Sequence, residues 1–141
     1  MKLTGLLAAL LLSYLPVAQA APVTIPPYVL MDSSSDMLMD KATALDMWKE
    51  HLPLKLAKLY PVGKWGFLSQ VEGGFDDAKL CIVTARASLL PRSGKSLLFQ
   101  PAKTATAFGS QSGASVAQCR ALAKAKLGEA MASIRSALLP R

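Results

Sequence analysis

Histidine, cysteine and aromatic side chains are scarce in this sequence. The 141 residues include one histidine and two cysteines, and only 6% of them are aromatic. Two cysteines and one histidine cannot complete a zinc site made of thiolate and imidazole ligands. No Cys-x-x-Cys pair is present, which disfavours a thiol redox enzyme. These shortages exclude the simplest zinc and thiol chemistries.

The motifs of nucleophilic catalysis are also missing. His51 has Asp46 and Glu50 nearby in the sequence, but no Gly-x-Ser-x-Gly accompanies it, and no serine is followed three positions later by lysine. At the end of a helix, a partly positive His51 would instead stabilise the helix dipole. We therefore predict no catalytic residue and a protein that is not an enzyme. A hydrolase that uses His51 stays open as an alternative.

Three aspartates, Asp32, Asp36 and Asp40, recur every four residues and could supply oxygen ligands to a metal. Calcium, however, takes six or more oxygens from a wrapped loop, and the Asp-x-Asp-x-Asp-Gly pattern of such a loop is absent. Acidic residues at the start of a helix need no metal, because they lie at the positive end of the helix dipole. We predict neither a metal nor a cofactor.

Long hydrophobic runs are lacking except at the N-terminus. There, Lys2 precedes an apolar core at residues 5–15, Pro16 interrupts it, and residues 18–20 form an A-x-A cleavage pattern. This core is shorter than the roughly 20 residues of a membrane-spanning helix. We expect residues 1–20 to be a signal peptide that is cleaved between Ala20 and Ala21. The mature protein would then be periplasmic or extracellular, without a membrane span.

The two cysteines, Cys81 and Cys119, allow a single intramolecular disulfide, which an oxidising compartment favours. Residues 79–86 have the composition of a central strand, with Cys81, Val83 and Ala85 on one face. Residues 116–138 repeat apolar residues at helical spacing, and Cys119 lies on that apolar face. A disulfide between them would hold the last helix across the central strand.

The remaining segments predict one α+β domain over residues 36–141. Residues 21–35 are expected to be an extended, proline-containing lead that ends in helix-capping residues, and residues 32–36 the start of a helix that reaches residue 52. A short helix over 54–59 follows. The expected strands cover 66–72, 79–86 and 96–100, with turns at 73–77 and 89–94; residues 103–108 could extend the third strand, and 109–113 would be a loop. The predicted architecture is an N-terminal helix, a three-stranded antiparallel β-meander and a long C-terminal helix packed on the sheet (α-β-β-β-α).

Acidic side chains are nearly absent from the C-terminal half. Residues 78–141 contain ten lysines or arginines and a single acid, Glu129, whereas residues 21–77 contain more acids than bases. The candidate anion-binding or partner-binding residues of this half are Arg86, Arg120, Lys124 and Arg135. We expect them to lie together once the last helix crosses the sheet. The two halves could also simply attract each other.

These patterns predict a small exported, non-catalytic interaction module. Its partner would be an unidentified protein or an anionic component of the cell envelope, and the basic C-terminal half would bind it. Phe75, in a turn, is a candidate exposed anchor. Residues 115–118 lack the lysines that double-stranded-RNA-binding domains of similar element order place there, so we expect no nucleic acid. The alternative is a binder of a small molecule or hydrophobic ligand. The oligomeric state is left open.

Overall fold

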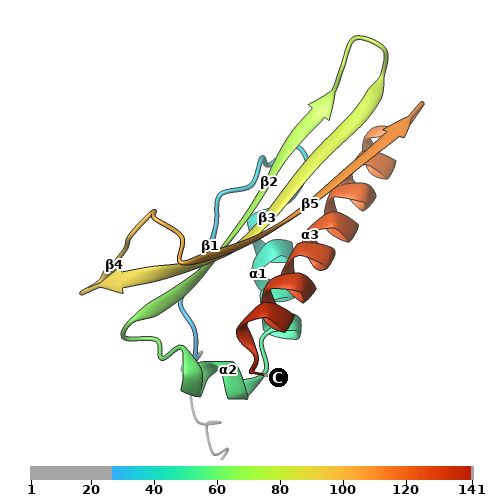
Figure 1. Ribbon diagram of the computed structural model, residues 1–141. Helices are drawn as coiled ribbons and strands as arrows, with labels where there is room; N and C mark the ends of the chain where they lie inside the picture. The colour runs from blue at the N-terminus through green and yellow to red at the C-terminus, as the bar shows by residue number, and fades with distance from the viewer. Residues whose placement is uncertain (1–26, 141) are drawn as a thin grey trace, which may run out of the picture.

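A curled sheet with helices on one face makes up the part of the chain that the computed structural model describes, residues 27–140 (Figure 1). The predicted signal peptide and its cleavage site lie outside these residues. The elements in chain order are β1 (Leu30–Asp32), α1 (Lys41–His51), α2 (Leu54–Leu59), β2 (Trp65–Phe75), β3 (Leu80–Ser93), β4 (Ser96–Leu97), β5 (Lys103–Ser112) and α3 (Val116–Leu138). The α+β class is confirmed.

The sheet is mixed, so the prediction of a purely antiparallel meander was wrong in its layout. The strands β2 and β3 form a long antiparallel hairpin, and β5 pairs antiparallel with the other edge of β3. On the far side, β1 runs parallel to β2, with Leu30 opposite Phe67. The residues before the first predicted helix therefore add a strand to the sheet.

The third predicted strand, residues 96–100 with a possible extension over 103–108, is two separate strands, and β5 continues through Ser112, where we expected a loop. Only Ser96 and Leu97 form β4, which pairs with the last residues of β3, whereas β5 takes the long position beside β3. The strand β3 continues through Pro91, where we expected a turn. Proline is tolerated there because Pro91 has a strand neighbour, Trp65 of β2, on one side only. On its other side the sheet ends just beyond β4, and the Pro91 carbonyl accepts a hydrogen bond from the Leu98 amide.

The first long helix starts later than its capping residues suggested. The backbone amides of Ser33 and Ser35 donate to the carbonyls of Ser69 and Val71, both at 2.9 Å. These bonds hold the segment along β2 and prevent a helix from starting there. The helix α1 begins instead at Lys41, after a cap from Asp40. The short helix α2 matches its prediction.

The β2–β3 hairpin is longer than predicted because two glycines continue the strand rather than end it. Gly73 and Gly74 have φ angles of 135° and 151°, in the region that favours glycine. Gly73 lies opposite Val83, and a Cβ on Gly73 would stand 2.0 Å from the Ile82 carbonyl oxygen. The turn follows at Asp76, whose carboxylate accepts hydrogen bonds from the backbone amides of Ala78 and of Leu80, the first residue of β3.

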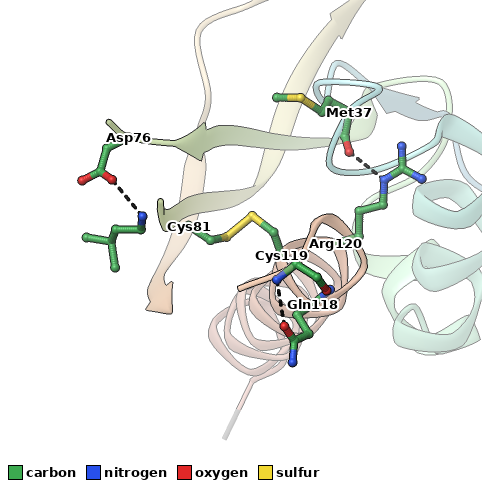
Figure 2. Close-up of a disulfide and its surroundings, with 8 residues drawn as sticks. Met37, Asp76, Cys81, Gln118, Cys119 and Arg120 are labelled. Atoms are coloured by element: carbon green, nitrogen blue, oxygen red, sulfur yellow. Dashed lines mark hydrogen bonds between the residues drawn. A yellow bond between two sulfur atoms is a disulfide. The ribbon is translucent and has the colours of Figure 1, made fainter. Parts of the chain in front are cut away.

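The core lies between α3 and one face of the sheet. Every second residue of β3 points to that face and is buried, and these residues pack against the buried side of α3. The β3 residues are Cys81, Val83, Ala85, Ala87 and Leu89, and the α3 residues are Cys119, Ala123, Leu127, Ala130, Met131 and Ile134. The predicted disulfide between Cys81 and Cys119 is confirmed, with a Cα–Cα distance of 5.7 Å (Figure 2). Small side chains on β3 let the helix approach the strand.

Candidate functional site

Two of the predicted partner-binding residues, Arg120 and Lys124, lie one turn apart on α3. They line an open groove with a volume of about 350 Å³, together with Asp36 and Asp40 from the segment before α1. The Arg120 Nε also donates to the Met37 backbone oxygen at 2.7 Å (Figure 2). Bases of the C-terminal half and acids of the N-terminal half thus line the same groove.

Arg135 lies on the same border of α3 as Arg120, about 22 Å from it along the helix axis at 1.5 Å per residue. It is half-buried beside a second groove of about 440 Å³, whose other lining residues include Tyr28, Leu30, Leu52 and Leu54. Arg135 and Lys49 are the two bases in this lining. The groove is therefore largely apolar, and its charged lining residues are these two bases and one acid, Glu50.

Arg86 lies on the opposite face of the sheet from α3. Successive residues of a strand point to opposite faces, and α3 packs against Ala85 and Ala87, so Arg86 projects away from it. Its guanidinium lies 3.7 Å from the Glu72 carboxylate of β2, and both side chains are about half exposed. The expected grouping of Arg86, Arg120, Lys124 and Arg135 on one surface was therefore wrong.

His51 ends α1, as its sequence position suggested, and is half-buried. Burial, together with the nearby Arg135 charge, holds the pKa of His51 below its ordinary value of 6.5. Its Nδ1 is buried without a hydrogen-bond partner among the described residues. A catalytic base needs a third group that orients its ring, and none is hydrogen-bonded to His51 in this part of the chain.

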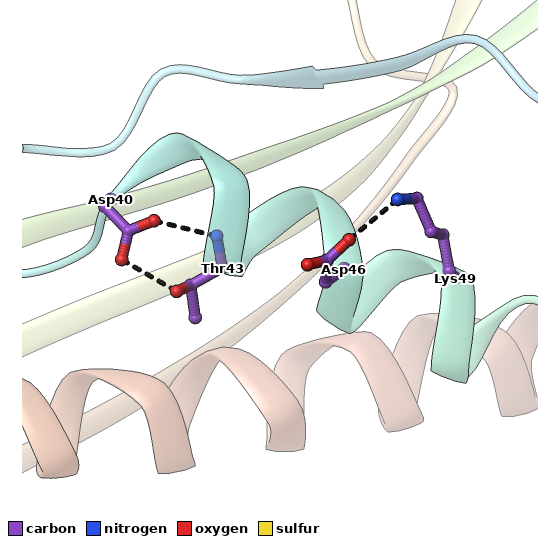
Figure 3. Close-up of polar contacts among 4 residues, drawn as sticks. All are labelled: Asp40, Thr43, Asp46 and Lys49. Carbon is purple, nitrogen blue, oxygen red and sulfur yellow. Dashed lines mark hydrogen bonds and ion pairs between the residues drawn. The ribbon is translucent and has the colours of Figure 1, made fainter.

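The aspartates that could have formed a metal site have separate structural contacts. The Asp40 carboxylate accepts from the backbone amide of Thr43 at 2.9 Å and from its hydroxyl at 2.7 Å, which lowers the pKa of Asp40 below 3.8 (Figure 3). The Asp32 carboxylate accepts from the Ser69 hydroxyl at 2.6 Å and thereby ties β1 to β2. Within residues 27–140, no group of three His, Cys, Asp or Glu side chains is arranged to hold a metal ion.

Phe75 closes β2 opposite Cys81, on the face of the sheet that carries α3. Its side chain is 40% exposed. It therefore lies at the end of strand β2 rather than within the turn, where we expected it.

The face of the sheet that points away from α3 is the surface that sequence reasoning missed. On the part of this face near the β2–β3 turn, Ile82 is 45% exposed and Phe108 is 71% exposed. They are diagonal neighbours, since Ile82 is opposite Ser110 and Phe108 is opposite Thr84, and they line a shallow groove of about 430 Å³. We call this surface, made by Ile82, Thr84, Arg86, Thr106, Phe108 and Ser110, the open face. The alternation at residues 104–108 was visible in the sequence, but its solvent exposure was not.

No helix of the described residues has the length and hydropathy that crossing a membrane requires. No protein-family model and no curated protein matches the sequence. Among solved structures, a singly substituted PelC dodecamer from Paraburkholderia phytofirmans aligns with a TM-score of 0.42 and 8% identity, over 81% of this chain and 93% of that chain. The PelC dodecamer from the same organism gives 0.40 and 10%, over 77% and 87%. This likeness assigns neither a family nor a function.

Proposed function

We propose that this protein is an exported, non-catalytic interaction module that binds a partner protein through the open face. The supporting observation is the exposure of Ile82 and Phe108 on a part of the sheet that no described element covers. Large apolar side chains that a monomer leaves in contact with water mark interaction sites when they adjoin one another. Export is supported by the sequence of residues 1–20 alone.

The chemistry of the open face favours a protein as the partner. Its apolar centre carries an aromatic ring, and Arg86 lies beside it, a combination enriched where proteins bind each other. Threonine and serine hydroxyls surround this centre and can form the polar rim of an interface. We expect an acidic side chain of the partner to meet Arg86 in place of, or together with, Glu72.

The experiment is capture from an envelope extract with the mature protein immobilised, followed by affinity measurement on the captured partner. Ile82→Asp and Arg86→Glu should each weaken binding at least 10-fold, since central contacts of an interface contribute about 2 kcal/mol or more. Capture should also fall between about 0.05 M and about 0.5 M salt, because screening shortens the reach of charges.

The matched control is Lys124→Glu, which makes the same change of charge as Arg86→Glu but on an exposed residue of α3, far from the open face. Its binding should equal that of the unsubstituted protein. If Lys124→Glu abolishes capture while Ile82→Asp leaves it intact, the binding surface is on α3 and the proposal is wrong.

A second candidate rests on the groove beside Arg135. A hydrophobic ligand that ends in a carboxylate could place its chain against Tyr28 and Leu54 and its charge near Arg135. Binding of a fluorescent fatty acid that is lost in Arg135→Ala, with little dependence on salt, would support it. Absence of such binding would leave the open face as the single candidate.

A further inference from the structure

We infer that the free edge of β5 binds a second copy of this chain, so that the two sheets join into one across a two-fold axis at Phe108. This inference goes beyond the proposed function: it shares Phe108 with the open face but rests on the free backbone edge of β5, and Ile82→Asp separates the two proposals because Ile82 lies on β3, away from that edge. Its evidence comes from the edge itself, from the residues that self-pairing would bring together, and from the charges on α3 beneath.

The strand β5 is a long, unprotected edge. It pairs with β3 along one side, and no other described strand pairs with its second side. Its residues 103–112 span about 33 Å at 3.3 Å per residue. Proteins usually protect such edges with charges, prolines or bulges, yet residues 104–112 contain no charged residue and no proline, and their register with β3 is unbroken. An edge without these features is suited to pairing with another strand.

The sequence of β5 is complementary to itself in one register. A two-fold axis at Phe108 would pair β5 antiparallel with β5 of the second copy. Residues 104–112 of one chain would then lie opposite the same uncharged residues of the other. Phe108 then faces the partner's Phe108, and Thr106 faces the partner's Ser110. Aromatic pairs and pairs of hydroxyl side chains are favourable cross-strand neighbours. On the other face, Ala107 meets the partner's Gly109, and a methyl group opposite a residue without a side chain does not hinder the approach.

The charges on α3 fit the same axis. Gly109 of β5 lies over Lys126, with the Lys126 Cε 2.8 Å from the position of a Gly109 Cβ. The Lys126 ammonium pairs with the Glu129 carboxylate one turn on, at 2.8 Å. Lys126 thus lies close to the proposed axis with its charge already paired to Glu129, so the two copies would bring no unpaired like charges together there.

The test is the mass of the mature protein in solution, by sedimentation velocity over a range of concentrations. The unsubstituted protein should be a dimer with a dissociation constant on the order of micromolar, as expected for a small interface. Phe108→Asp should weaken dimerisation at least 10-fold, because the two new carboxylates would face each other. Phe99→Asp is the matched control, since Phe99 is 72% exposed and Phe108 71%, but Phe99 lies outside β5; this variant should stay dimeric.

A cysteine substitution reports the register directly. Phe108→Cys should form an intermolecular disulfide that reducing agent reverses, and Phe99→Cys should not. Circular dichroism checks that each variant is folded, and both positions are exposed enough to tolerate change. A monomer up to about 1 mM, a dimer that survives Phe108→Asp, or a strand captured from another protein in place of a second copy would each overturn the inference.

Discussion

Arg120 Nε donates a hydrogen bond to the Met37 backbone oxygen at 2.7 Å, which connects α3 to the segment that precedes α1. Arg120, which we predicted from the sequence to bind a partner, therefore also stabilises the fold. The same contact lies at the groove where Asp36 and Asp40 face the helix. The acidic and basic halves of the chain meet at this point.

Replacing Arg120 should therefore reduce stability. We expect Arg120→Ala to lower the free energy of unfolding by about 1 kcal/mol, because a hydrogen bond from a charged donor is lost at a solvent-exposed site. Lys124→Ala, one turn away and without this contact, should change it by less than about 0.5 kcal/mol. Urea denaturation measures both. Equal losses in the two variants would mean that the Arg120 to Met37 bond contributes nothing specific.

The disulfide should contribute more than any single hydrogen bond. It closes a loop with a sequence separation of 38, for which the chain-entropy model gives roughly 4 kcal/mol. The double variant Cys81→Ala with Cys119→Ala should lose about that amount in denaturant unfolding. Mass spectrometry of the unsubstituted protein should find no free thiol. Two reactive thiols in folded protein isolated from the periplasm would contradict the expectation.

Gly73 should not tolerate any side chain. Its φ of 135° is disfavoured for other residues, and a Cβ there would collide with the Ile82 carbonyl. We expect Gly73→Ala to cost about 3 kcal/mol, mainly as backbone strain in the hairpin. Gly63→Ala is the control, because no atom lies within 4 Å of its Cβ position. Thermal unfolding should show a lower midpoint for Gly73→Ala alone; an unchanged midpoint would mean that the hairpin adapts.

Asp40 should make stability depend on pH in the acidic range. The Thr43 amide and hydroxyl lower its pKa below 3.8 in the folded protein, so the unfolded chain takes up a proton first as the pH falls. The contribution of Asp40 is therefore present above the unfolded pKa and lost as the pH drops through the folded one. Asp40→Asn should remove this part of the pH dependence, and Thr43→Val should raise the pKa of Asp40 measured by NMR. An unchanged acid profile in Asp40→Asn would refute the assignment.

The errors in the predicted fold arise where pairing with a distant segment overrides the local preference of a residue. Ser33, Ser35 and Asp36 are good helix caps by type, yet the serine amides bond to the backbone along β2. Gly73 and Gly74 are typical turn residues, but here their positive φ angles continue the strand. A serine suits a helix cap and a glycine suits a turn, but each residue type also fits other backbone conformations. The pairing partner that selects one of them is distant in the sequence.

The sequence by itself determined the α+β class, the long α3, the short α2 and the disulfide. Each depends on a periodicity, a cap within a few residues, or the only possible pair of cysteines. The tertiary structure alone decided that Arg86 lies across the sheet from Arg120 and that Phe108 is exposed. A strand pattern shows which residues share a face, but not which face the helix covers. That choice depends on packing between distant segments, and it places the open face and the β5 edge in contact with solvent.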